Sequence, residues 1–101
     1  MAFYQLSTGA KASLDEYNQV QERLAATGTA VPGRILQVCF GDKDDVKILN
    51  VWESQEACDS FMQSVMMPLF EEFGITDRGR YIETGEVHKV SLAGPAAPGG
   101  S

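Results

Sequence analysis

Residues 34–40, RILQVCF, and residues 46–52, VKILNVW, decide the fold of this chain. Both runs are rich in branched aliphatic and aromatic residues, which favour β-strands, and GDKDD at 41–45 between them is typical of a turn. The sequence therefore predicts a β-hairpin in the middle of the chain. If it turns about Lys43 and Asp44, the expected cross-strand pairs are Gln37 with Asn50, Cys39 with Ile48, and Ile35 with Trp52.

Both faces of this hairpin carry apolar side chains, because alternate residues of a strand point to opposite faces. One face is aliphatic and holds Leu36, Val38, Leu49 and Val51, whereas the other holds Ile35, Gln37, Cys39, Ile48, Asn50 and Trp52. We expect helices to cover the face with Gln37, Asn50 and Trp52. An open aliphatic face of this kind is rare on a monomer, so we expect two copies to pack sheet against sheet as a homodimer.

Further elements flank the hairpin on both sides. Before it, residues 2–7 form an expected strand, and the capping box of Ser13 and Glu16 begins a helix that Gly28 ends. After it, Ser54 caps a second helix that extends to Phe73, with a kink expected near Met67 because Pro68 lacks an amide proton. A last strand is predicted over residues 86–92.

The order of elements is typical of an α+β, ferredoxin-like βαββαβ fold, a four-stranded antiparallel sheet with two helices on one face. We expect residues 1–92 to form a single domain. The small residues AGPAAPGGS at 93–101 bury too little apolar surface to offset their ordering entropy, so they are predicted to be a disordered tail.

Composition excludes several classes of function. The net charge of −6 argues against nucleic acid or an anionic membrane surface as a partner. No apolar run approaches the roughly 20 residues of a membrane span, and no signal sequence is evident, so a cytoplasmic location is expected. Cys39 and Cys58 are too few for a disulfide scaffold and are predicted to be structural thiols.

Few side chains are candidates for a catalytic, binding or metal-ligating role. A buried amide without a partner costs about 1–3 kcal/mol, so Gln37 and Asn50 either bond one another or bind water or a ligand. His88 is the only imidazole and is either a surface or hydrogen-bonded side chain or a proton acceptor. Met62 and Met66 fill the core or line an apolar pocket. One His and scattered carboxylates match no metal-site spacing, so no metal is predicted.

The junction VWESQEA at residues 51–57 resembles the WES-x-EA junction of the antibiotic biosynthesis monooxygenase superfamily, whose members form dimeric α/β barrels. The resemblance extends over residues 2–92. The Pro32-Gly33 turn, the Met67-Pro68-Leu69 step and the segment Glu86 to His88 are similar to small actinobacterial members. The superfamily includes cofactor-free oxygenases of aromatic polyketides, heme-degrading enzymes, cyclases or isomerases, and members without a known reaction, so it indicates fold more strongly than activity.

This resemblance implies a homodimeric enzyme that acts on an aromatic or polyketide-like small molecule, with cofactor-independent monooxygenation as the leading reaction and no cofactor. Family oxygenases hold the substrate with pocket Asn and Trp residues, so the expected catalytic residues are Asn50 and Trp52, together with His88. The expected substrate-binding residues are Gln37, Tyr17, Met62 and Met66. Heme-degrading members use a helix His, which the second helix lacks. The alternatives are a non-catalytic small-ligand-binding or interaction protein of the same fold, or a cyclase or isomerase.

Overall fold

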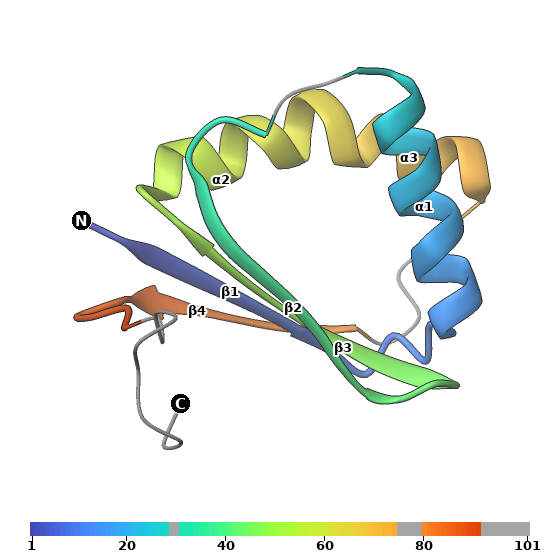
Figure 1. Ribbon diagram of the computed structural model, residues 1–101, viewed down its shortest axis with the longest axis horizontal. Coiled ribbons are helices and arrows are strands. Elements are labelled where there is room, and N and C mark those ends of the chain that lie inside the picture. The colour runs from blue at the N-terminus through green and yellow to red at the C-terminus, as the bar shows by residue number, and fades with distance from the viewer. Residues whose placement is uncertain (29–30, 75–79, 92–101) are drawn as a thin grey trace, which may run out of the picture.

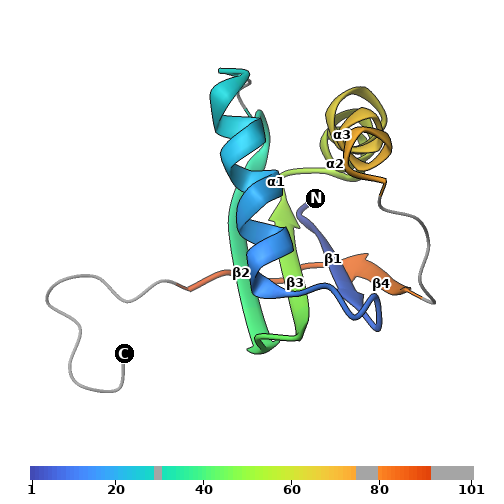
Figure 2. The same ribbon diagram turned by 90° about the vertical axis from the view of Figure 1, so that its right-hand side faces the viewer.

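Four antiparallel strands form a sheet with helices on one face (Figure 1). The computed structural model describes residues 1–28, 31–74 and 80–91. The strands are β1 (Phe3–Thr8), β2 (Arg34–Asp42), β3 (Asp45–Trp52) and β4 (Tyr81–Glu86), in the spatial order β2-β3-β1-β4. The helix α1 (Leu14–Ala26) and the helical segment that follows β3 lie on the same side of the sheet (Figure 2). The predicted α+β ferredoxin-like arrangement is confirmed.

The central hairpin has the predicted register except at one end. Gln37 pairs with Asn50 and Cys39 with Ile48, but a bulge between Arg34 and Leu36 places Arg34, not Ile35, opposite Trp52. The predicted pairing of Ile35 with Trp52 is therefore wrong. A bulge inserts one residue into a strand and turns the residues beyond it onto the other face. Ile35 is consequently 44% exposed, and Arg34 lies beneath the helices in its place.

The second helical segment consists of α2 (Gln55–Phe61), the π-helical turn η1 (Met62–Met66) and α3 (Met67–Phe73). It begins at Ser54, whose Oγ accepts a hydrogen bond from Ala57 N at 3.1 Å, and ends at Gly74 in the left-handed conformation. The irregularity predicted near Met67 is a π-turn just before it. Pro68 has no amide proton to donate to the carbonyl four residues earlier. The wider π-helical turn at Met62–Met66, just before Pro68, replaces the usual hydrogen bonds from residue i to residue i−4.

Helix α1 begins at the predicted cap, where Ser13 Oγ accepts a hydrogen bond from Glu16 N at 3.0 Å. An ion pair of 2.8 Å between Arg23 and Glu72 links α1 to α3 at the surface. The core fills the space between the helices and the sheet and contains Val20, Leu24, Trp52, Cys58, Phe61 and Leu69. Within the described ranges, no helix is long and apolar enough to cross a bilayer.

The last strand lies earlier than predicted, at Tyr81–Glu86 rather than 86–92. It pairs with β1 from Thr8 back to Phe3, and the final contact is the bond from Val87 N to Ala2 O at 2.8 Å. Because β1 begins at Phe3, a longer strand would have no partner. His88 follows the strand and is exposed, so its predicted position on a strand is wrong. The tail predicted at 93–101 lies outside the described residues.

Candidate functional site

A cavity of about 110 Å³ lies between the sheet and the helices. It contains six of the seven residues that the sequence analysis selected, namely Tyr17, Gln37, Asn50, Trp52, Met62 and Met66. His88 does not line it. Val20 and Leu24 of α1 and Phe61 of α2 complete an apolar wall opposite the sheet. The cavity is therefore an apolar space with a few polar groups, which is the usual composition of a small-molecule site.

The strand register arranges the floor of the cavity in rows. Cross-strand neighbours share a face, so Gln37, Asn50 and Gln5 form one row of three amides across β2, β3 and β1. The next row toward the end of β3 contains Arg34, Trp52 and Phe3. The row on the other side contains Cys39, Ile48, Ser7 and Ile82. Adjacent rows are two residues apart along a strand, or about 7 Å.

Two hydrogen bonds connect α1 to the row of amides. The Tyr17 hydroxyl donates to Gln37 Oε1 at 2.8 Å, and Gln37 Nε2 donates to Asn50 Oδ1 at 3.0 Å. The expectation that Gln37 and Asn50 bond one another is thus correct. No hydrogen bond from Asn50 Nδ2 is present among the described residues, so this amide keeps both of its donors for another group in the cavity.

Burial raises the pKa of Tyr17, with a further contribution from Cys39. Its hydroxyl therefore stays protonated at neutral pH and acts as a hydrogen-bond donor. Burial also lowers the pKa of Arg34, and the proximity of Tyr17 partly opposes this effect. Both shifts have the same origin, which is that a charged group is less well solvated in the cavity than in water.

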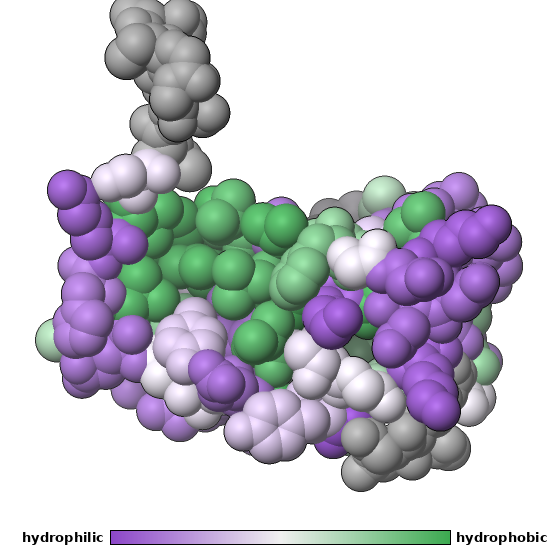
Figure 3. Space-filling model, turned by 90° about the horizontal axis from the view of Figure 1, so that it is seen from below, coloured by the Kyte–Doolittle hydropathy of each residue, from purple (hydrophilic) through white to green (hydrophobic). Residues whose placement is uncertain are grey.

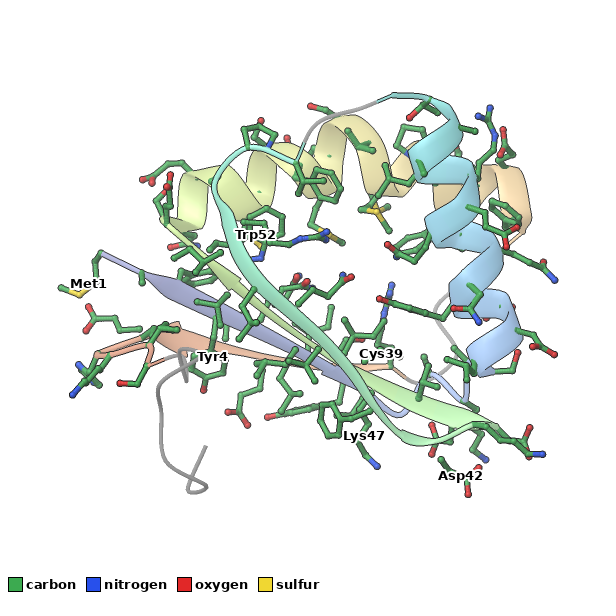
Figure 4. The ribbon with its side chains drawn as sticks, in the orientation of Figure 1. Met1, Tyr4, Cys39, Asp42, Lys47 and Trp52 are labelled. Carbon is green, nitrogen blue, oxygen red and sulfur yellow. The ribbon has the colours of Figure 1, made fainter. Side chains whose placement is uncertain are left out.

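Trp52 forms the end of the cavity beneath the second helical segment. It is 1% exposed, and its ring lies 5.5 Å from that of Phe61 at an angle of 43°. Its Nε1 is buried and has no hydrogen-bond partner in the described part of the chain. In Figure 4, Trp52 lies between the sheet and the helices, whereas Tyr4 and Lys47 lie on the far side of the sheet. An unpaired indole N–H in a cavity is a free donor for a ligand.

Sequence reasoning missed Arg34, Gln5 and Arg80 as cavity residues. Arg34 enters the cavity only because of the bulge, which the sequence does not signal. Gln5 had a usable signal, since it is a polar residue between the inward Phe3 and Ser7 of a mostly apolar strand. Arg80 lies just before β4, whose start was predicted five residues further on, and its guanidinium stacks 5.2 Å from the centre of the Phe70 ring.

The two cysteines do not line the cavity. Burial raises the pKa of the Cys58 thiol to about 11, and Cys39 is shifted in the same direction, which fits the predicted structural role of both thiols. In residues 1–28, 31–74 and 80–91, no three His, Cys, Asp or Glu side chains lie together as metal ligands would.

The opposite face of the sheet carries a broad apolar patch bordered by polar residues (Figure 3). The pairing of the strands places Leu36, Val38 and Phe40 of β2 on it, beside Leu49 of β3 and Leu6 of β1. Phe40 is 43% exposed there. As predicted from alternation in the hairpin, the helices leave this face uncovered.

The sequence matches no model of a known protein family and no curated protein sequence. The fold matches solved structures. A mutant of SnoaB, a cofactor-independent oxygenase from Streptomyces nogalater, superposes with a TM-score of 0.61 at 12% identity, over 88% of this chain and 94% of that one. A Caulobacter crescentus protein classed with the antibiotic biosynthesis monooxygenases gives 0.63 at 18% identity, over 87% and 90%.

The heme-degrading protein Rv3592 from Mycobacterium tuberculosis gives a TM-score of 0.55 at 16% identity, over 93% of this chain and 98% of that one. The resemblance to the antibiotic biosynthesis monooxygenase superfamily is thereby confirmed for the fold over most of the chain. At these identities the likeness establishes the fold, and the site must be interpreted from its own residues.

Proposed function

We propose that this protein is an enzyme that binds an aromatic or polyketide-like small molecule in the cavity and oxygenates it without a cofactor. The observation that supports this most is the chain of hydrogen bonds from Tyr17 through Gln37 to Asn50, which ends in free amide donors inside an apolar space. SnoaB, which shares the fold, is a cofactor-independent oxygenase.

The cavity residues suit this chemistry. In a cofactor-independent oxygenation the substrate supplies the electrons to dioxygen, so the protein must hold an activated phenol or enol and favour its anion. We assign Asn50 and Gln37 to the substrate oxygen, Trp52 to stacking on its ring, and Met62 and Met66 to the adaptable apolar wall. Tyr17, at the head of the hydrogen-bond chain, keeps its proton at neutral pH and orients Gln37 and Asn50, which stabilise the substrate anion once its proton is released to water.

His88 keeps its predicted catalytic role only as a hypothesis, because its side chain is exposed and outside the cavity. A base must come within hydrogen-bond reach of the proton that it removes.

The size of the cavity limits the substrate. A cavity of roughly 150 Å³ in another protein binds benzene, and the cavity here is about 110 Å³. A single ring therefore fills the enclosed part, and further rings of a polyketide would extend past Ile82, which lines the cavity and is half exposed.

A second copy of the chain is the partner that we propose for the open face. Sheet-to-sheet packing of two such faces buries the apolar side chains of both copies and leaves neither exposed. The two cavities then lie on the outer sides of the shared core, each beneath its own helices.

Oxygen uptake tests the reaction. With a chelator present and no added flavin or metal, an electron-rich phenol or enol should be consumed together with dioxygen, because the substrate is the reductant. Tight binding of such compounds without oxygen uptake would instead indicate a binding protein or an isomerase, and the absence of binding would contradict the site assignment.

A further inference from the structure

We propose that Arg34 and Trp52 form an anion-recognising pair, so that the ligand of this cavity is an aromatic carboxylic acid. This inference rests on the proposed function, since it concerns the same cavity, and it adds a second recognition point to the row of amides. The two residues are cross-strand neighbours on β2 and β3 and both line the cavity.

The Trp52 indole and the Arg34 guanidinium are hydrogen-bond donors that have no acceptor side chain among the described residues. Trp52 Nε1 is buried without a partner, and the Arg34 guanidinium makes no ion pair or hydrogen bond with any side chain in the described parts of the chain. Cross-strand Cβ atoms are about 5 Å apart, so both side chains enter the cavity from the same place on the sheet. A carboxylate has two acceptor oxygens and matches the planar fork of a guanidinium, which makes it the natural occupant.

The charge distribution of the cavity favours an anion at this end. Among the described residues that line the cavity, Arg34 is the charged group at this end. Arg80 lines the other end, because β4 begins with the pairing of Tyr81 and Thr8, and Glu16 is the carboxylate of the lining. Glu16 lies at the opposite end, because its helix begins beside the start of β3, where Val46 N donates to Ala12 O at 2.9 Å. The seven residues from Val46 to Trp52 extend about 20 Å. This positive end contrasts with the net charge of −6 of the whole chain.

The spacing of the rows defines the geometry of the ligand. Asn50 and Trp52 are two residues apart on one face of β3, a separation of about 7 Å. One benzene ring with substituents at opposite positions spans this distance, with its carboxylate at Arg34 and its hydroxyl at Asn50. The burial that lowers the pKa of Arg34 is compensated when a carboxylate binds beside it.

Binding of three small probes tests the inference, with quenching of Trp52, the only tryptophan, as the readout. The probes are 4-hydroxybenzoate, its methyl ester and 4-methylphenol, at a pH where the acid is ionised and the other two are neutral. We expect the acid to bind about tenfold more tightly than the ester to the unaltered protein. Arg34→Gln should abolish this preference, and Arg34→Lys should retain part of it because the charge remains.

Arg23→Gln is the matched control, because it removes the same charge from a surface ion pair outside the cavity. It should leave the preference for the acid unchanged. Equal binding of all three probes would overturn the anion inference and leave the proposed function standing. If none of the probes binds, both fail. Loss of the preference in the Arg23 variant as well would show a general charge effect and would also overturn the inference.

Discussion

Gln37 and Asn50 face each other across β2 and β3, and their amides are joined by a hydrogen bond of 3.0 Å that Tyr17 extends from α1. The contact fixes the orientation of the Asn50 amide, since its oxygen is occupied as an acceptor. Its nitrogen is left with donors that point to no other described residue. The two amides therefore do not satisfy all of each other's hydrogen-bonding groups. They belong to a chain of hydrogen bonds that begins at the Tyr17 hydroxyl and ends at the Asn50 amide nitrogen.

Asn50→Ala should weaken the binding of a phenolic ligand by about 1–2 kcal/mol, or roughly 5- to 30-fold, because one hydrogen bond is lost. Quenching of Trp52 fluorescence measures the affinity. Asp42→Ala, at the far tip of the hairpin, is the control and should bind as the unaltered protein does. An unchanged affinity of the Asn50 variant would favour a purely structural role for the amides.

Tyr17→Phe should lower turnover without large loss of stability, because it removes a hydroxyl and keeps the ring. Oxygen uptake at saturating substrate measures this, and Tyr81→Phe is the control, since that side chain is exposed and outside the cavity. His88→Ala should bind ligand with unchanged affinity. A fall in turnover for His88→Ala, with Tyr17→Phe fully active, would make His88 the proton acceptor and contradict the role assigned to Tyr17.

Phe40→Asp should convert a dimer to a monomer, because it places a charge in the proposed contact between two sheets. The side chain is 43% exposed in the single chain, so the fold itself should tolerate the change. Leu14→Asp is matched in exposure at 41% and lies at the start of α1, away from the open face, so it should leave the assembly intact. Sedimentation of the unaltered chain as a stable monomer at micromolar concentration would refute the dimer.

Gly33→Ala should destabilise the fold by at least about 1–2 kcal/mol, the cost of the left-handed conformation for a residue with a Cβ. Gly33 has φ +83°, and an added Cβ would meet Ala57 Cβ at 2.7 Å. Gly28→Ala is the control, with φ +68° and open space around it, so it should show the conformational cost alone. Urea denaturation of both variants separates the conformational cost from the cost of the contact with Ala57. Equal decreases in the free energy of unfolding would mean that this contact is unimportant.

Cys58 should resist thiol reagents at pH 8, because its pKa is raised to about 11 and the thiolate is the reactive form. In the Cys39→Ser variant, Cys58 is the remaining thiol. Its rate of reaction with a thiol reagent should rise as the pH approaches about 11. A fast reaction near neutral pH in the folded protein would show that Cys58 is accessible and ionised, contrary to its 2% exposure.

The local chemistry of the chain was enough to predict much of this fold. Ser13 and Ser54 cap the two helices as expected, and the turn at Lys43 and Asp44 sets the pairing of Gln37 with Asn50. These features depend on residues that are close in sequence, whose hydrogen bonds and turn preferences act over a few positions. Alternation along the hairpin then placed Asn50 and Trp52 beneath the helices.

Only the tertiary structure decided which other groups share the cavity with them. The bulge that brings Arg34 opposite Trp52 follows Gly33, which lies close to Ala57 of α2, a residue distant in the chain. The position of β4 was set by the length of β1, its hydrogen-bonding partner, and this left His88 outside the sheet. Such features arise from packing and from the satisfaction of backbone hydrogen bonds across the sheet, which no local pattern encodes.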